Sequence, residues 1–257
     1  MEFEISKLKL QNLINVPIQE IVVLKETGST SDVAKELFKK GVKTALVVSE
    51  SQTNGRGRIN RQFYSPKEKG VYLSLLISPN LDIISAPKIT GYAGVICANA
   101  IESLAPIKVG LKWVNDLFIN SKKVGGILTE SGINSKTRTL DYAVIGIGIN
   151  VYDDVYPNFI KDVATNVERE SGVKINKNEL IAKIVNNLFD LENSIKTNSY
   201  LKEYKERQII LNKQVKVVLN SEEFYATAVD IDKNGALIVL KDGKKQTILF
   251  GDVSIRV

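Results

Sequence analysis

Histidine is absent from the 257-residue sequence, and cysteine occurs only once, at Cys97. The first absence excludes catalytic triads and metal sites that depend on an imidazole side chain. The second excludes an intrachain disulfide and a cysteine metal cluster, and a chain without disulfides suits a reducing cytosol. Cys97 lies in the apolar run 94–98, so we interpret it as a small core residue.

Long hydrophobic runs are also missing. No stretch of the sequence reaches the roughly eighteen apolar residues that a membrane-spanning helix needs. The N-terminus does not have the layout of a signal peptide. The sequence therefore predicts a cytoplasmic protein with no membrane partner.

Clustered positive charge is the third feature that the chain lacks. The net charge is +6, yet no run of basic residues is longer than a pair such as Lys39-Lys40. Proteins that bind nucleic acids usually concentrate their basic residues in a run or patch. We therefore expect no nucleic-acid partner.

Apolar runs and amphipathic segments alternate through most of the chain, which predicts an α+β fold with a mixed β-sheet flanked by helices. The expected strands are 21–24, 44–49, 71–77, 108–113, 117–119, 124–129 and 142–151, and the expected helices are 29–40, 85–104 and 177–195. From about residue 208 the pattern changes to short strands separated by turns, at 215–219, 224–231, 236–240 and 247–250. The predicted domains are a main domain over 1–207 and a small β-barrel over 208–257.

The most informative segment is residues 52–66, which we call the arginine loop. It connects two expected strands and contains Arg56, Arg58 and Arg61 beside Gly55 and Gly57. Guanidinium groups are permanently charged and match the oxygens of phosphates and carboxylates. Glycine allows the backbone to approach a ligand closely. The segment therefore predicts a loop that wraps around an anionic small molecule.

A second group of functional candidates surrounds the turn at Asn120-Ser121. Lys112 and Lys123 could converge on one pocket, and Asn115 and Asp116 offer oxygen atoms for magnesium or hydrogen bonds to a phosphate. For this segment alone, a plain hairpin with solvated lysines is the favoured interpretation. Farther along, 146–150 places two glycines in an apolar strand, which indicates close approach of a ligand or another backbone, or tight helix packing.

Taken in order, these segments resemble the biotin protein ligase family. The matching motifs are Ser29-Thr30, Gln52, Gly55-Arg56-Gly57-Arg58 with Arg61, Lys112-Trp113-Val114-Asn115-Asp116-Leu117, Lys123 with Gly125-Gly126-Ile127-Leu128, and 146–150. Each motif is weak alone, but their order and spacing are specific, and 251–256 resembles the end of that family's barrel. The resemblance implies a catalytic sheet like that of class II aminoacyl-tRNA synthetases and a barrel like the Src-homology-3 domain. The first expected strand begins at residue 21, so we expect the short type without an N-terminal DNA-binding domain.

The resemblance also implies an activity. Members of the family join biotin to ATP, release pyrophosphate, and hold biotinyl-5′-AMP until a lysine of a biotin carboxyl carrier protein attacks it. ATP and biotin would be substrates, with Mg²⁺ accompanying the phosphates. A homodimer is implied as well, and apolar strands such as 124–128 could pair across its two-fold axis. Closure of the arginine loop would exclude water from the reactive adenylate.

Individual roles are carried over from the same resemblance. The catalytic residues would be Lys112, Arg58 and Lys123. Biotin would be bound by Ser29, Thr30, Ser31, Gln52, Gly55, Arg56, Gly57, Arg58, Lys123 and Gly126. ATP and the adenylate would be bound by Arg56, Arg58, Arg61, Phe63, Lys112, Trp113, Asn115 and Asn150. Mg²⁺ would be held, through the phosphates, near Asn115 and Asp116. For Ser29, Thr30 and Ser31, helix capping is the alternative role.

Three positions depart from the family's pattern. Asn60 replaces a glycine, Phe63 replaces a tryptophan, and Val114 replaces a proline. Phe63 keeps an aromatic ring, Val114 suits the end of a strand, and asparagine tolerates a left-handed backbone. Two alternative functions remain open: a lipoate or octanoyl ligase or transferase of the same fold, and a non-catalytic biotin-binding module. The intact arginine loop and the Lys112–Asp116 motif favour a biotin-specific enzyme.

Overall fold

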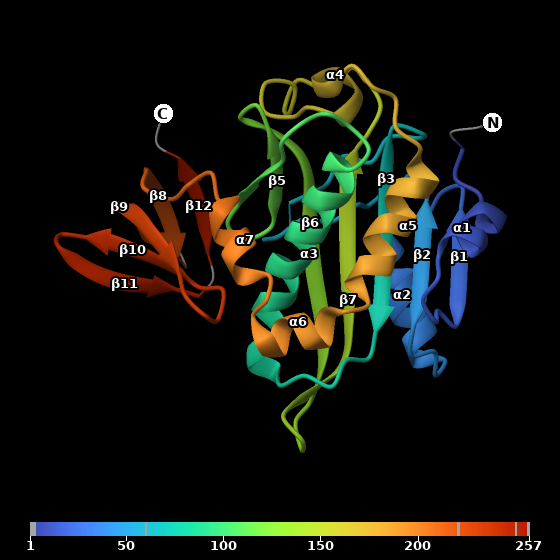
Figure 1. The fold of residues 1–257 in the computed structure, drawn as a ribbon, viewed down its shortest axis with the longest axis horizontal. Helices are drawn as coiled ribbons and strands as arrows, with labels where there is room; N and C mark the ends of the chain where they lie inside the picture. The colour runs from blue at the N-terminus through green and yellow to red at the C-terminus, as the bar shows by residue number, and fades with distance from the viewer. Residues whose placement is uncertain (1–3, 60, 220–221, 250, 256–257) are drawn as a thin grey trace.

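A seven-stranded mixed sheet forms the main body of the computed structural model, which describes residues 4–59, 61–219, 222–249 and 251–255 (Figure 1). The strand order is β1-β2-β3-β7-β6-β5-β4. The strands are β1 (Glu20–Leu24), β2 (Ala45–Ser49), β3 (Gly70–Ile77), β4 (Gly110–Lys112), β5 (Asp116–Ile119), β6 (Lys122–Asn134) and β7 (Thr139–Asn150). The pair β1–β2 is parallel and the other neighbouring strands are antiparallel, which confirms the predicted mixed sheet.

Helices cover both faces of this sheet. They are α1 (Lys7–Leu13), α2 (Thr30–Lys39), α3 (Ala86–Glu102), α4 (Val167–Ser171), α5 (Lys177–Leu188), α6 (Leu191–Thr197) and α7 (Leu201–Glu206), with a short 3-10 helix η1 (Ile83–Ser85) before α3. Successive side chains of a strand point to opposite faces. Leu46 and Val48 of β2 accordingly join the large core under α3 and α5, whereas Val47 joins a smaller core under α2 with Ala34.

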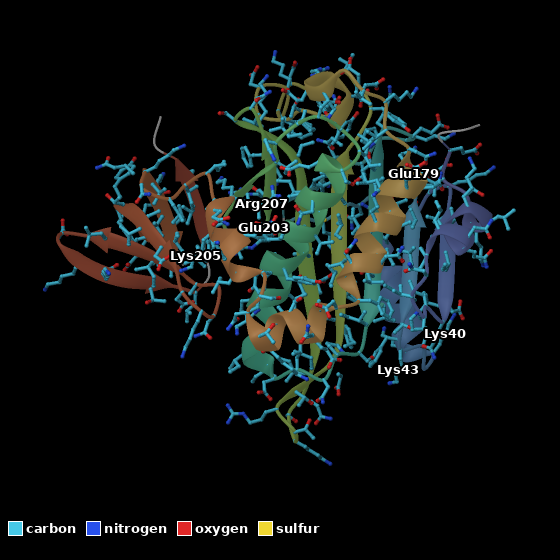
Figure 2. The ribbon with its side chains drawn as sticks, in the orientation of Figure 1. Lys40, Lys43, Glu179, Glu203, Lys205 and Arg207 are labelled. Carbon is cyan, nitrogen blue, oxygen red and sulfur yellow. The ribbon has the colours of Figure 1, made fainter. Side chains whose placement is uncertain are left out.

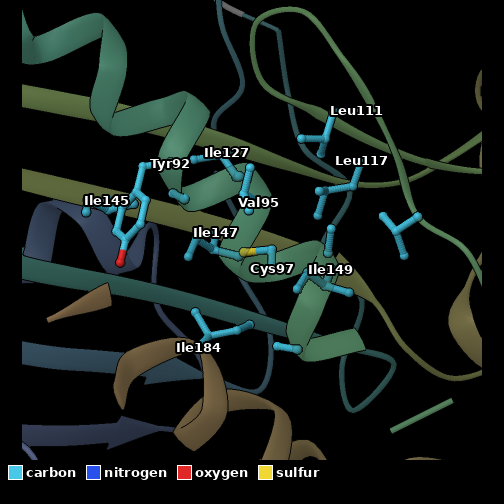
Figure 3. Close-up of a cluster of buried hydrophobic side chains, with 14 of the residues drawn as sticks. Tyr92, Val95, Cys97, Leu111, Leu117, Ile127, Ile145, Ile147, Ile149 and Ile184 are labelled. Atoms are coloured by element: carbon cyan, nitrogen blue, oxygen red, sulfur yellow. The ribbon is translucent and has the colours of Figure 1, made fainter. Parts of the chain in front are cut away.

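The large core lies between α3 and the central strands (Figure 3). Val95 and Cys97 of α3 pack over Ile145, Ile147 and Ile149 of β7 in this core. Cys97 is fully buried, and burial raises the pKa of its thiol far above the ordinary value. The prediction that Cys97 is a core residue is confirmed. None of the helices in the described ranges has the length and hydropathy needed to cross a bilayer.

The prediction of one continuous helix over 177–195 is wrong, because the structure divides this range into α5 and α6. The division falls at Asp190, which precedes α6. Its carboxylate accepts hydrogen bonds from Ser194 Oγ at 2.8 Å and from Asn193 Nδ2 at 3.3 Å. These side-chain hydrogen bonds join Asp190 to the first turn of α6, where the new helix begins.

The C-terminal part is a separate five-stranded antiparallel sheet, which confirms the predicted all-β unit. Its strands are β8 (Gln214–Leu219), β9 (Glu222–Ile231), β10 (Leu237–Lys241), β11 (Lys244–Ile248) and β12 (Asp252–Ile255), in the order β11-β10-β9-β8-β12. The expected last strand, 247–250, ends beyond β11, and residue 250 lies outside the described residues. The return strand β12 was not anticipated, and it pairs with β8.

The connection between the two sheets runs through α7. Lys205 of α7 points toward the C-terminal sheet in Figure 2 and pairs with Asp230 of β9 at 2.7 Å. Just after α7, Leu111 of β4 donates to the Arg207 carbonyl at 2.8 Å, and Ile209 donates to the Leu111 carbonyl at 2.9 Å. The chain therefore leaves the main sheet along its β4 edge, and the domain boundary at 207/208 stays a prediction.

Candidate active site

A pocket opens between the arginine loop and the strands β3, β7 and β6. Among the predicted site residues, those that line it are Ser29, Thr30, Ser31, Gln52, Arg56, Gly57, Arg58, Arg61, Phe63, Asn115, Asp116, Lys123 and Gly126. The apolar part of the lining comes from the sheet itself, through Leu73, Ile127, Leu128 and Ile147. Segments far apart in the sequence therefore meet at one site.

A buried polar network forms one end of the pocket. Gln52 Oε1 accepts hydrogen bonds from the Thr30 backbone N–H at 2.9 Å and from Thr30 Oγ1 at 3.2 Å. The hydroxyls of Thr30 and Ser31 lie 2.8 and 3.0 Å from Ser74 Oγ. Gln52 Nε2 donates to Ser65 Oγ at 3.1 Å. Ser74 was missed by the sequence interpretation, although a serine in the apolar run 71–77 was a usable signal.

Ser29 precedes α2 in the N-cap position, with an extended φ of −155°. Its side chain makes no capping hydrogen bond, and Gln52 instead accepts from the first N–H of the helix, that of Thr30. The usual N-cap arrangement uses the side-chain oxygen of the capping residue. The capping alternative therefore does not account for the hydroxyl of Ser29, which lines the pocket.

Arg56 is bound by carboxylates of the protein. Its two terminal nitrogens donate to both oxygens of Asp32, at 2.8 and 2.7 Å, and Nη2 also contacts Glu130 at 3.3 Å. Lys35 donates to the other Glu130 oxygen at 2.6 Å. The hydrogen bond to Asp32 raises the pKa of Arg56, against the opposing effect of burial. The charge of Arg56 is thus balanced inside a four-residue network, and its predicted contact with phosphates stays a prediction.

The second half of the arginine loop reaches the C-terminal sheet. Arg58 donates to the Gly251 carbonyl at 3.1 Å and to Asn115 Oδ1 at 3.5 Å. Arg61 forms an ion pair with Asp252, the first residue of β12. Asp252 also lines the pocket. The sequence interpretation missed Asp252, because nothing local shows where the terminal segment lies.

The hairpin β5–β6 supplies the other cation of the pocket lining. Lys123 Nζ lies 2.7 Å from Asp116 Oδ1. Gly126 lies directly against this pair, because a Cβ atom there would be in van der Waals contact with Lys123 Nζ, at 3.4 Å. Asn115 is held by hydrogen bonds in both directions with the backbone of Ile127, at 2.9 and 3.1 Å. Of the two lysines predicted to converge on one pocket, Lys123 lines it, together with Asn115 and Asp116, and Lys112 does not.

Four predicted residues are not among those that line the pocket. Burial lowers the pKa of the Lys112 ammonium group, and the nearby charges of Asp116 and Asp252, which do line the pocket, oppose that shift. Trp113 is buried, and its indole N–H donates to the Gly235 carbonyl of the C-terminal sheet at 2.9 Å. The other two are Gly55 and Asn150, and Asn150 Nδ2 donates to the Thr165 carbonyl at 3.0 Å.

The glycines of the loop and of β7 make room for protein atoms. A Cβ at Gly148 would lie 2.5 Å from the Phe63 ring, and one at Gly146 would lie 3.0 Å from Ser31 Oγ. At Gly55 a Cβ would lie 2.5 Å from the Phe63 carbonyl oxygen. Phe63 therefore packs directly on the sheet. Asn60, the other departure in the loop, lies outside the described residues.

Comparison with known proteins connects this geometry to a family. Residues 23–150 match the biotin/lipoate A/B protein ligase family, and residues 210–256 match the biotin protein ligase C terminal domain. The bifunctional ligase/repressor BirA of Bacillus spizizenii is 36% identical over 170 residues, which are 65% of this chain and 52% of BirA. A biotin–acetyl-CoA-carboxylase ligase of Mycobacterium tuberculosis is 25% identical over 251 residues, which are 91% of this chain and 88% of that protein.

The chain spans about half the length of the Bacillus BirA relatives that it matches. Among solved structures, a biotin protein ligase from Aquifex aeolicus in complex with biotin and ATP superimposes with a TM-score of 0.78 at 27% identity, over 93% of this chain and 99% of that one. The two family matches cover both sheets, and the solved structure has the same arrangement. This chain therefore belongs to the biotin protein ligase family.

Proposed function

We propose that this chain is an ATP-dependent biotin protein ligase, which makes biotinyl-5′-AMP and transfers biotin to a lysine of a biotin carboxyl carrier protein. The observation that carries the proposal is one pocket that joins a buried polar network around Gln52 to the cations Arg58, Arg61 and Lys123. Such a pocket suits a ligand with a polar ring at one end and negative charge at the other.

Biotin fits this division. Its ureido group has both donors and acceptors, which match the hydroxyl and amide groups of Thr30, Ser31 and Gln52. Its thiophene ring and valeryl chain are apolar and suit the lining from Leu73 and Ile147. The carboxylate would then contact Lys123 in place of Asp116. Lipoate has no ureido group, so it would not make these additional hydrogen bonds with the hydroxyl and amide groups.

Adenylation brings two anions together. A carboxylate oxygen of biotin attacks the α-phosphorus of ATP, a new C–O–P linkage forms, and the bond to pyrophosphate breaks. Arg58 and Arg61 would offset the phosphate charge, and donors fixed in advance stabilise charge that develops in the transition state. Lys112, whose ammonium group interacts with the charges of Asp116 and Asp252, would add to this positive field.

Magnesium would reach the site with the nucleotide. Within the described ranges, no group of three acidic, cysteine or histidine side chains could hold a metal ion. Asp116 already contacts Lys123, and Asn115 Oδ1 accepts from Arg58. Mg²⁺ is often held by one or two carboxylates together with substrate phosphates, so this donor set fits Mg²⁺ bound to ATP. When bound, the ion would neutralise phosphate charge.

The second step is acyl transfer. The amine of the carrier lysine attacks the biotinyl carbonyl, an amide bond forms, and AMP leaves with the bonding electrons while the ammonium loses a proton. The mixed anhydride hydrolyses readily in water, so the arginine loop would have to cover it. The proposed site of action is the cytoplasm.

The proposed function predicts a specific exchange reaction. Incubation with ATP, Mg²⁺ and labelled pyrophosphate should give labelled ATP only when biotin is added, because exchange requires a reversible adenylation. Lipoate and octanoate are the controls for the related ligases. Exchange with lipoate instead of biotin would favour the lipoate enzyme, and biotin binding without exchange would favour a non-catalytic module.

We also infer a homodimer, formed through β6. The stretch 124–128 proposed from the sequence lies mostly between two partners, because β5 pairs with β6 as far as Gly126 and β7 pairs from Gly125 to Asn134. Beyond Ile127, whose backbone is hydrogen-bonded to Asn115, the described strand β6 pairs with β7 alone, so its other edge is available to a second copy. An open strand edge is a natural template for pairing.

This dimer can be tested by sedimentation velocity. Ile133 is 57% exposed on the free part of β6, so Ile133→Lys would place a positive charge from each copy in the proposed interface. We expect dimerisation to weaken by about tenfold or more. Leu8→Lys, on α1 and 67% exposed, is the matched control and should leave the dimer unchanged. A wild-type chain that stays monomeric with biotin and ATP would refute the dimer.

A further inference from the structure

The two halves of the arginine loop are held by anchors of different strength, and only the second anchor lies where ATP phosphates are proposed to bind. We propose that Asp252 is a positioning residue that holds Arg61 in the ligand-free chain and competes with the phosphates of ATP for its guanidinium group. The C-terminal sheet would thereby set the affinity for ATP and leave the affinity for biotin unchanged. The inference rests on the proposed function.

The first anchor is strong. Arg56 makes a bidentate pair with Asp32, at 2.7 and 2.8 Å, and a third contact with Glu130. The Arg56 side chain is 31% exposed and that of Asp32 is 53% exposed, so the strength of this anchor comes from its bidentate geometry and its third contact. Lys35 completes the network on the far side of Glu130. Bidentate guanidinium–carboxylate pairs are the strongest and most directional ion pairs of this kind. This half of the loop, next to the biotin-binding network, is therefore fixed before any ligand arrives.

The second anchor is exposed. The Arg61 side chain is 71% exposed, and its partner Asp252 is 33% exposed. Ion pairs in contact with water are weak and are screened by salt. Arg58 adds only a neutral carbonyl contact to Gly251. A ligand with several negative charges can therefore take Arg61 from a single carboxylate.

The carboxylate is the fixed partner in this pair and the arginine is the movable one. Gly251, immediately before Asp252, has φ +126°, a conformation that side chains disfavour. A Cβ there would lie 2.6 Å from Leu219 Cδ2 and 2.7 Å from the Val218 carbonyl oxygen. Asp252 itself pairs with Val218 in the sheet. The backbone at Gly251 and Asp252 is thus packed tightly against β8, whereas Arg61 belongs to a loop.

The position of Asp252 in the pocket determines which substrate its carboxylate affects. Asp252 lines the pocket on the side of Arg61, whereas the predicted contact of the biotin carboxylate is Lys123, which is paired with Asp116. When triphosphate binds Arg61, the carboxylate of Asp252 is released to solvent near other anions. Both the lost ion pair and the new repulsion oppose ATP binding. Neither changes when biotin binds.

The test is Asp252→Asn, which keeps the shape of the side chain and removes its charge. We expect the KM for ATP in biotin-dependent exchange to fall by about two- to fivefold, the factor that corresponds to one exposed ion pair. The KM for biotin should not change. Asp242→Asn is the matched control, because Asp242 is an exposed acidic residue in the β10–β11 turn of the same sheet. It should leave both constants unchanged.

A double-mutant cycle separates the ion pair from general repulsion. In an Arg61→Gln background, Asp252→Asn should lower the KM for ATP by less than in the wild type, because only the repulsion between Asp252 and the phosphates is left to remove. Direct calorimetric titration with a non-hydrolysable ATP analogue gives the same comparison without turnover. A KM for ATP that rises or stays constant in Asp252→Asn, or an effect of the same size without Arg61, would overturn the inference. Absence of exchange and of ATP binding in the wild-type chain would instead refute the proposed function, and the competition with it.

Discussion

Replacement of Lys123 by methionine is expected to lower kcat/KM for biotin in the exchange reaction by about 10²- to 10³-fold, the effect of removing one fixed donor at a site of developing charge. Lys123 Nζ lies 2.7 Å from Asp116 Oδ1, and both side chains line the pocket. Without the ammonium group, Asp116 would stay as an unbalanced negative charge where the biotin carboxylate is proposed to bind. The loss should therefore combine a missing attraction with a new repulsion.

Lys122→Met is the matched control. Lys122 is the neighbouring residue of β6, and it is exposed. Successive side chains of a strand point to opposite faces, so this substitution removes the same charge on the other side and should leave exchange unchanged. Kinetics over a range of biotin concentrations, with circular dichroism for the fold, make the comparison. If Lys123→Met keeps exchange within tenfold of the wild type, Lys123 does not bind the carboxylate as proposed.

The sequence predicts the positions of the central strands well, because strands buried on both faces are nearly continuous apolar runs. Both 71–77 and 142–151 agree closely with β3 and β7. The hairpin β6–β7 is longer than expected at its far end, where 130–141 contains polar residues and Gly132. There the strands extend beyond the core, so hydrogen bonding between strands keeps them regular without an apolar pattern.

Loop and hairpin motifs identified most of the pocket residues, because charged side chains and glycines stand out between apolar strands. The acidic residues that pair with Arg56 and Arg61 were not predictable, because they lie far away in the sequence. Arg61 and Asp252 are separated by 191 residues, and Arg56 and Glu130 by 74. An acidic residue on a strand looks the same in the sequence whether it faces solvent or an arginine. The contacts of Arg56 with Asp32 and of Arg61 with Asp252 depend on how the helix, loop and second sheet come together, which no local pattern shows.

Arg207 links α3, α7 and β4, so its replacement is expected to cause the largest loss of stability. Its guanidinium group donates to both oxygens of Glu102, at 2.8 and 3.1 Å, and also to Asn99, Glu203 and the Val109 carbonyl. The side chains of Arg207 and Glu102 are only 15% and 14% exposed. Removing one partner of a buried ion pair leaves an uncompensated charge, so Arg207→Met should lower the free energy of unfolding by about 3 kcal/mol.

The pH dependence of this loss identifies its cause. Burial alone would raise the pKa of Glu102, but the hydrogen bonds from Arg207 and the Val109 backbone N–H outweigh it and hold the pKa below its ordinary value. The pair therefore stabilises the fold above the pKa that Glu102 has in the unfolded chain, and this contribution is lost as the pH falls through the folded-state pKa. Urea unfolding should show a large difference between wild type and Arg207→Met at neutral pH and a smaller one in acid.

Lys202→Met on the same helix is the control for Arg207→Met. Lys202 pairs with Glu206 at 3.9 Å, with both side chains exposed, so its loss should change the free energy of unfolding by no more than about 0.5 kcal/mol. Glu102→Gln combined with Arg207→Met should recover part of the stability, because it removes the charge left unpaired. The loss of unfolding free energy in Arg207→Met could instead be the same at neutral and acid pH. That result would mean that packing of the Arg207 side chain, and not its ion pair with Glu102, joins α7 to the main sheet.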